Sequence, residues 1–195
     1  MRSIFRVLPL LLALSGLVGS AFAGGSIAFA EAVAKSEYPE AGKEYYARHC
    51  FMYEDGKHIT TNYWRGTLVP INSKITVVVA TPSKLVLEIE ETGETVKVDN
   101  VAKYTKCDMR EISRRMLSAD PIDLDDCDEA MANAIKSGTM RLGMTKDEVL
   151  MARGFPPAHK TPVLRSDRWQ YWPSRVVVQT LVFADGKLVE GRGID

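Results

Sequence analysis

The segment from residue 143 to 157 constrains the fold most, because the signals that begin and end one helix agree within it. Thr145 and Glu148 have the spacing of a capping box, in which each side chain hydrogen-bonds to the backbone N–H group of the other residue. Gly154 and the prolines that follow it predict an abrupt end of the helix. Apolar side chains recur at helical spacing, so this helix is expected to pack against another element through Val149, Ala152 and Phe155.

Strand-forming residues follow this helix. Aromatic and β-branched side chains are frequent in the runs 168–172 and 176–183, which favours two strands. Asp185 and Gly186 can both adopt positive φ, so they predict a type I′ turn into a third strand over residues 187–189. The three strands are expected to be antiparallel because short turns connect them.

A second helix is predicted before the first, over residues 128–137. Its apolar residues have helical spacing, and Gly138 stands where a C-terminal cap belongs. The expected order of the last third of the chain is therefore helix, helix and three strands.

Several short pieces of this region occur in a fixed order: Gly143-Met144-Thr145, Val149, Gly154, Pro156, Trp169-x-Tyr171 and Phe183-x-Asp185-Gly186-Lys187. The series resembles the SmpA/OmlA (BamE-like) domain family over residues 128–194. The resemblance implies a small periplasmic ααβββ domain, in a family whose best-known member is an accessory subunit of the outer-membrane β-barrel assembly machine. The same arrangement is similar to the β-lactamase-inhibitor-protein fold, so it implies a binding scaffold more than a particular partner.

Residues 1–23 have the three-part plan of a secretory signal peptide. Arg2 and Arg6 precede an apolar run over 7–18, and small residues follow; a second small-x-small site ends at Ala30. Cleavage at either site would export the chain to the periplasm, whereas a retained anchor is the alternative. No cysteine follows the apolar run, so the lipid anchor usual in BamE-like proteins is not expected. Peripheral association with the outer membrane would then occur without a lipid.

Charge and motifs exclude several classes of function. Loss of the leader removes two arginines and no acidic residue, which lowers the formal net charge from zero to minus two. Without a clustered basic excess, nucleic acid is not an expected partner. The chain has no G-x-S-x-G, H-E-x-x-H, phosphate-loop or dinucleotide glycine pattern, so no catalytic residue, metal or cofactor is predicted. The acidic run over 123–128 lacks EF-hand spacing and is better explained by the N-terminus of the next helix.

The fold class predicted is α+β, with three parts. Residues 40–106 show period-two alternation and frequent turn residues, which favour a small all-β module similar to an SH3-like barrel. An amphipathic helix is predicted within residues 107–120, as a linker that ends before Pro121. Residues 121–195 form the predicted BamE-like ααβββ domain.

Aromatic residues in the first module are candidates for a ligand groove, namely Tyr53, Tyr63 and Trp64. The competing interpretation places them in the core, where aromatics of small barrels are usually found. In the last third, Trp169 and Tyr171 are expected on the packed face of the sheet and Trp172 on the opposite face. Trp172 with Arg168 and Arg175 is a candidate protein-binding surface, and the proline-stiffened loop adds His159 and Lys160.

The cysteines form an odd set of three, so one disulfide would leave one thiol over. Cys107 with Cys127 is a candidate pair, Cys50 with Cys107 is the alternative, and all three thiols can also remain free. Spacing alone does not decide among these.

The sequence thus favours a non-enzymatic, exported protein-binding scaffold of the cell envelope. Its expected partners are envelope or outer-membrane proteins, with an accessory role in outer-membrane protein assembly as the specific hypothesis. The alternative is a periplasmic cell-wall or ligand-binding module that acts through the N-terminal β-domain. A third hypothesis is an enzyme that uses Cys50 or a histidine, although neighbouring strand residues point to opposite faces and cannot readily form a Cys–His pair.

Overall fold

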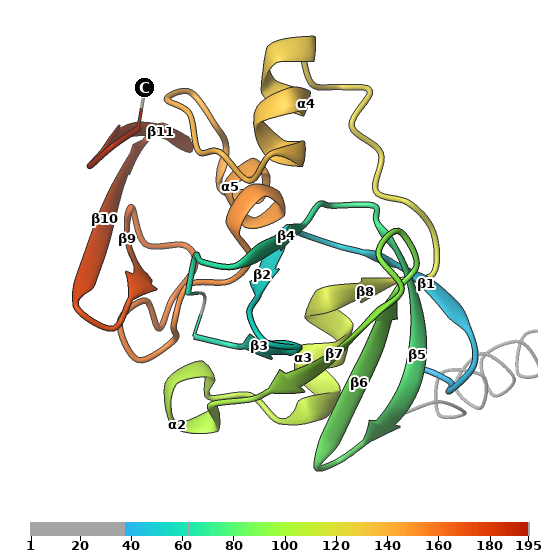
Figure 1. Cartoon of the computed structure of the whole chain (residues 1–195). Coiled ribbons are helices and arrows are strands. Elements are labelled where there is room, and N and C mark those ends of the chain that lie inside the picture. The colour runs from blue at the N-terminus through green and yellow to red at the C-terminus, as the bar shows by residue number, and fades with distance from the viewer. Residues whose placement is uncertain (1–37, 62, 195) are drawn as a thin grey trace, which may run out of the picture. The chain divides into compact units, whose positions relative to one another are not determined.

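The computed structural model describes residues 38–61 and 63–194, which belong to one compact unit (Figure 1). The predicted leader lies outside the described residues. Strands predominate and helices are few and short, which confirms the α+β class. Within the described residues, no helix is long and apolar enough to cross a membrane.

The first half of the unit contains a six-stranded sheet in the order β3-β7-β6-β5-β1-β8. Its pairs are antiparallel except for β3 with β7, which is parallel. A separate antiparallel pair joins β2 to β4. The strands are β1 (Glu44–Ala47), β2 (Phe51–Tyr53), β3 (Lys57–Ile59), β4 (Thr67–Val69), β5 (Lys74–Thr81), β6 (Lys84–Ile89), β7 (Glu94–Asp99) and β8 (Leu117–Ser118).

Strand β3 ends at Ile59, and the side chain of the next residue, Thr60, bonds to the backbone. The hydroxyl of Thr60 donates to the carbonyl of Asp99 and accepts from the N–H of Val101, at 3.2 and 2.9 Å. Such bonds compete with the regular ladder of a sheet. The chain therefore leaves the strand after Ile59.

Two helices follow β7, α2 (Ala102–Thr105) and α3 (Met109–Met116). The carboxylate of Asp108 caps α3 by accepting from the N–H of Glu111, at 2.8 Å. The apolar face of α3 is buried together with strands β5 to β7 in the first hydrophobic cluster. The helix predicted within residues 107–120 therefore contributes its apolar face to the core of this half.

The last third has the predicted order of elements: α4 (Glu129–Lys136), α5 (Lys146–Arg153), β9 (Arg168–Ser174), β10 (Val177–Ala184) and β11 (Lys187–Gly191). The strands form one antiparallel sheet in the order β11-β10-β9. The capping box of Thr145 and Glu148 is formed. Asp185 and Gly186 adopt φ values of 51° and 77°, as the predicted turn requires.

A second hydrophobic cluster lies between this sheet and helices α4 and α5. Trp169 and Tyr171 are fully buried in it, which confirms that they share the packed face. Cys50 and Ile71, from the strand-rich first half, also belong to this cluster. The first half therefore contributes side chains to the core of the last third.

Candidate functional site

The first half of the chain meets the last third at Cys50, which lies just before β2 and is fully buried. Its backbone N–H donates to the carbonyl of Met151, and its thiol donates to the carbonyl of Ile135, at 2.8 and 3.1 Å. The N–H of Ile71 donates to the sulfur, at 3.2 Å. Burial raises the pKa of the thiol to about 11, so it stays protonated and is a poor nucleophile.

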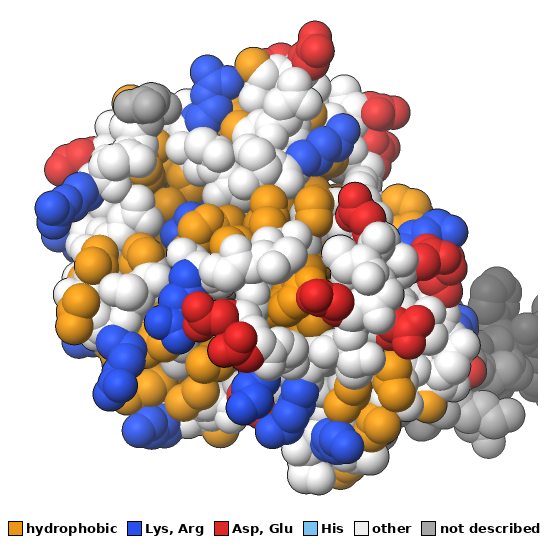
Figure 2. All heavy atoms as spheres, in the orientation of Figure 1, with side chains coloured by type: hydrophobic (Ala, Val, Ile, Leu, Met, Phe, Trp, Pro, Cys, Tyr) orange, Lys and Arg blue, Asp and Glu red, His pale blue; other side chains and the backbone are white. Residues whose placement is uncertain are grey.

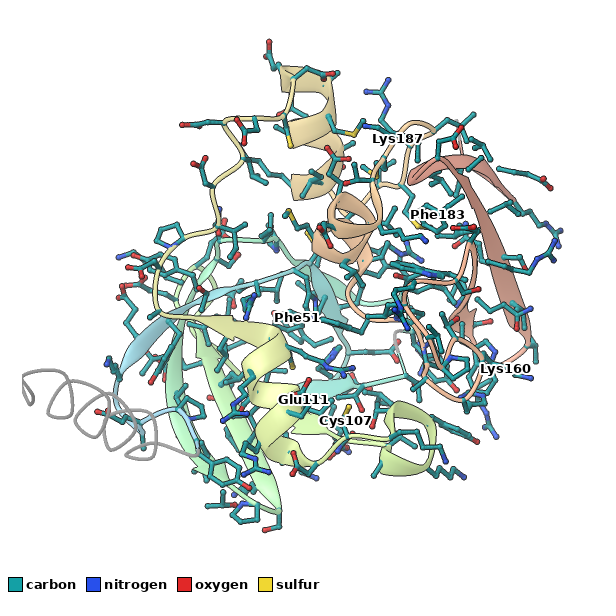
Figure 3. The ribbon with its side chains drawn as sticks, turned by 180° about the vertical axis from the view of Figure 1, so that it is seen from behind. Phe51, Cys107, Glu111, Lys160, Phe183 and Lys187 are labelled. Atoms are coloured by element: carbon teal, nitrogen blue, oxygen red, sulfur yellow. The ribbon has the colours of Figure 1, made fainter. Side chains whose placement is uncertain are left out.

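Two buried histidines flank the ring of Phe51 beside this junction. Phe51 lies between α3 and α5 (Figure 3), and its ring centroid is 6.4 Å from that of His49 and 5.0 Å from that of His58. In each histidine Nδ1 lies within 2.9 Å of a backbone carbonyl oxygen, so Nδ1 carries the proton and Nε2 keeps its lone pair. Burial lowers the pKa of both imidazoles to about 4, and both are neutral near pH 7.

These histidines line a cavity of about 40 Å³, which we call the junction pocket. Its walls come from the β2–β3 region, from α3 and from the residues that follow α5, and include His49, His58, Tyr63, Trp64, Arg115 and Phe155. Two of the three predicted groove residues, Tyr63 and Trp64, therefore lie at one pocket. Tyr53 is not part of it: this side chain is buried in the first cluster and its hydroxyl donates to the carboxylate of Glu94. Tyr53 and Tyr63 together line a neighbouring hollow of about 180 Å³.

Trp64 is held on two sides. The guanidinium carbon of Arg153 lies 3.8 Å from its ring centroid, a cation–π contact. Burial lowers the pKa of Arg153 to about 10, so the guanidinium remains charged near pH 7. On another side, a Cβ added to Gly138 would lie only 2.3 Å from the indole ring. The close approach of a glycine and the stacked arginine thus fix this wall of the pocket.

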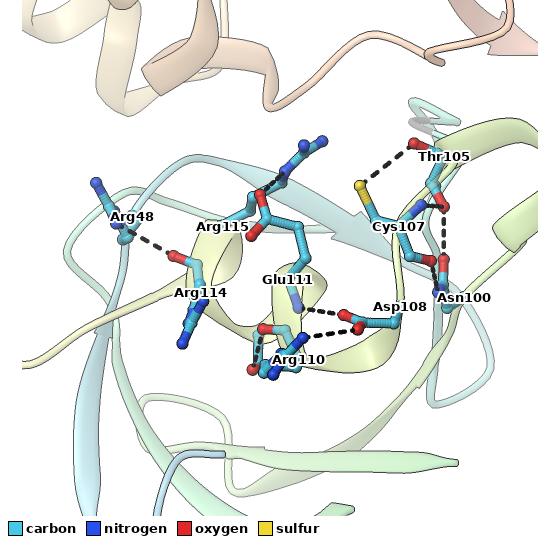
Figure 4. Close-up of polar contacts among 10 residues, drawn as sticks. Arg48, Asn100, Thr105, Cys107, Asp108, Arg110, Glu111, Arg114 and Arg115 are labelled. Carbon is cyan, nitrogen blue, oxygen red and sulfur yellow. Dashed lines mark hydrogen bonds and ion pairs between the residues drawn. The ribbon is translucent and has the colours of Figure 1, made fainter. Parts of the chain in front are cut away.

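A more open cleft of about 460 Å³ adjoins the junction pocket and shares His49, Arg115 and Phe155 with it. We call it the arginine cleft, because Arg48, Arg114 and Arg115 line it around the C-terminal end of α3 (Figure 4). Its acidic residues are Glu111 and Asp147. The predicted groove residues indicated one part of the junction pocket, whereas no sequence pattern indicated the arginine cleft, because its walls come from residues far apart in the chain.

Trp172 lies on the face of β9 opposite to Trp169 and Tyr171, as predicted, but other rings partly cover it. Its ring centroid is 4.5 Å from that of His159 and 5.2 Å from that of Tyr104 in α2. The N–H of His159 donates to the carbonyl of Tyr104, at 3.2 Å. Trp172, predicted to lie on the outer face of the sheet, is therefore half-buried, because Tyr104 of α2 packs against it.

The remaining predicted binding residues are exposed. Arg168 begins β9, at the end of the sheet away from the β9–β10 turn. Arg175 lies in that turn, and Lys160 lies near the same end of the sheet as the turn (Figure 3). Val176 in this turn is 91% exposed, and the next two valines are exposed as well. Figure 2 shows hydrophobic side chains over this hairpin, with basic side chains close by. We call Arg175 and Val176–Val178 the hairpin surface.

The candidate disulfide between Cys107 and Cys127 is not formed, because all three cysteines carry free thiols. The thiol of Cys107 donates to the carbonyl of Thr105, at 3.3 Å. That of Cys127 lies 3.7 Å from the carboxylate of Glu148, in a different part of the fold. Among the residues that the structure describes, no three His, Cys, Asp or Glu side chains are placed to share a metal ion.

No protein-family model matches the chain, and neither a curated protein nor a solved structure matches it.

Proposed function

We propose that the chain is an exported, non-enzymatic protein-binding scaffold of the cell envelope, located in the periplasm and associated with the outer membrane. The observation that carries this proposal is the hairpin surface, where adjacent valines stand in solvent beside basic side chains. Exposed apolar patches with a polar rim are typical of protein-binding sites. Trp172 lies toward this surface on the outer face of β9, and Arg168 lies on the same face at the other end of the strand. Trp and Arg are enriched at binding hot spots.

The specific role proposed is accessory to outer-membrane protein assembly. It is supported by the resemblance over residues 128–194 and by the order α4, α5, β9, β10, β11. The finer fold assignments belong to the same proposal: an SH3-like barrel over 40–106, a linker over 107–120 and a BamE-like domain over 121–195.

Site-specific photocrosslinking in intact cells tests this function. A photoreactive amino acid replaces Val176 in the hairpin surface, and in a matched variant it replaces Val78, an exposed valine of β5. We expect adducts with outer-membrane assembly proteins from position 176 and none from position 78. Identical adducts from both positions, or none from either, would contradict a binding role for the hairpin.

A second candidate function is a ligand-binding or cell-wall-binding module in the N-terminal β-domain. The observation that favours it is the position of Tyr63 and Trp64 at the junction pocket. Cys50 and Ile71 of the first half pack in the second cluster, so deletion of the last third would expose them. Point variants of the full chain are therefore a better test than that deletion. This function would be supported if the wild-type chain is retained on purified peptidoglycan and the Tyr63→Ala variant is not.

A further inference from the structure

The inner part of the junction pocket suits a small apolar group. Besides its aromatic walls it is lined by Met52, Ile112 and Met116, and its two histidines are neutral with Nδ1 bonded to the backbone. A cavity of roughly 150 Å³ is needed to hold benzene. At about 40 Å³, the pocket has room for an aliphatic branch and not for an aromatic ring.

The positive charge lies in the adjoining arginine cleft, which shares three lining residues with the junction pocket. Arg115 is paired with Glu111, at 2.8 Å between Nε and Oε1, and its guanidinium carbon lies 4.4 Å from the ring centroid of Phe155. Arg48 and Arg114 are exposed, and within the described part of the chain neither forms an ion pair with an acidic side chain.

The guanidinium of Arg48 is anchored to the end of α3 from which Arg114 extends. A guanidinium nitrogen of Arg48 donates to the backbone carbonyl of Arg114, at 3.1 Å, and the N–H of Arg48 donates to the carbonyl of Met116, at 2.8 Å. Figure 4 shows Arg48 beside Arg114 at this end of α3. With Glu111 already paired, Asp147 is the remaining acidic residue of the cleft, so the cleft carries an excess of positive charge. Guanidinium groups bind carboxylates in a two-pronged geometry.

We propose that the junction pocket and the arginine cleft together bind a short acidic peptide segment of a partner protein. One aliphatic side chain enters the pocket, and carboxylates on either side of it bind Arg48 and Arg114. The shared wall of His49, Arg115 and Phe155 places the apolar and the charged parts next to each other. This site is separate from the hairpin surface and requires no component of the outer membrane.

The test measures fluorescence anisotropy of a labelled peptide, Gly-Glu-Asp-Val-Asp-Glu-Gly amide, with the full-length chain. We expect saturable binding that weakens at high salt and falls at least tenfold when the valine becomes alanine or the acids become amides. The double variant Arg48→Glu/Arg114→Glu is expected to lose at least tenfold in affinity. Arg141→Glu, at an exposed arginine outside both hollows, is the matched control and should bind normally.

A pocket-filling variant, Met52→Phe, should weaken binding of the valine peptide while thermal unfolding confirms that the chain is folded. Absence of saturable binding to the wild-type chain, or equal loss in the Arg141 control, would overturn the peptide site. Retention on peptidoglycan that depends on Arg48 and Arg114, with no peptide binding, would also overturn it. Crosslinks from position 176 report on the hairpin surface and do not depend on the peptide site. A negative result in the peptide-binding experiment can therefore be distinguished from a negative result in the crosslinking experiment.

Discussion

The sulfur of Cys50 lies 3.1 Å from the carbonyl oxygen of Ile135, which joins the strand-rich half of the chain to the last turn of α4. Carbonyl groups in the last turn of a helix have no partner within the helix and need other donors. The carbonyl of Ile135 accepts from the N–H of Gly138, at 2.9 Å, and from the buried thiol of Cys50, while the N–H of Ile71 donates to the same sulfur. One small side chain thus connects three segments that are distant in sequence.

Cys50→Ala is expected to destabilise the protein by about 1–3 kcal/mol, because it removes these bonds and leaves a buried N–H without a partner. Urea unfolding at pH 7 measures the change. Cys107→Ala is the control, since this half-exposed cysteine lies outside the junction. Equal stability of the two variants would show that the Cys50 contacts add nothing. In the native protein Cys50 should also resist thiol reagents that label Cys107 or Cys127.

Gly138→Ala should be much more destabilising than Gly143→Ala. Both glycines have positive φ, of 67° and 88°, so alanine carries a similar backbone cost at each, roughly 1–2 kcal/mol. Only at Gly138 would the new methyl group overlap the ring of Trp64, whereas Gly143 faces open space. Thermal unfolding of both variants isolates the steric part. If the two lose the same stability, the indole ring moves aside easily and does not form a fixed wall.

Stability is expected to fall as the pH is lowered from about 6.5 to about 4. Burial, opposed in part by hydrogen bonds to backbone carbonyls, lowers the pKa of His49 and His58 from 6.5 to about 4. In this range the unfolded chain therefore binds protons that the folded chain does not, and the difference reaches roughly 3 kcal/mol per histidine at the low end. Unfolding in urea at several pH values measures the slope. His49→Asn and His58→Asn should each flatten it, and a flat profile for the wild-type chain would contradict neutral buried histidines.

Trp172→Ala should cost less stability than Trp169→Ala. The half-buried Trp172 loses ring contacts with His159 and Tyr104, for which about 1–2 kcal/mol is expected. Trp169 is fully buried and its indole N–H donates to a backbone carbonyl, so its loss should cost roughly 3–5 kcal/mol. Crosslinking from position 176 in the folded Trp172→Ala variant should decrease. If Trp172→Ala instead unfolds the domain as Trp169→Ala does, Trp172 is a core residue and not a partner contact.

Short-range sequence signals were sufficient for the elements of the last third. The capping box of Thr145 and Glu148 forms, the turn of Asp185 and Gly186 has positive φ, and Gly138 follows α4 with positive φ. Each of these features depends on residues within four positions of one another, so no distant contact is needed to specify it. The alternation of Trp169, Tyr171 and Trp172 between faces follows in the same way from the period of a strand.

The junction pocket, in contrast, depends on the folded chain. Its walls include His49, Tyr63, Arg115 and Phe155, which are separated by many residues and by several elements. Hydrophobic burial is not directional, so apolar patterns identify which faces are buried but not which faces meet. The half-buried state of Trp172 has the same origin, because α2 supplies Tyr104 from the other half of the chain. Periodicity thus specified the helices, strands and turns, while long-range packing around Cys50 brought the pocket together.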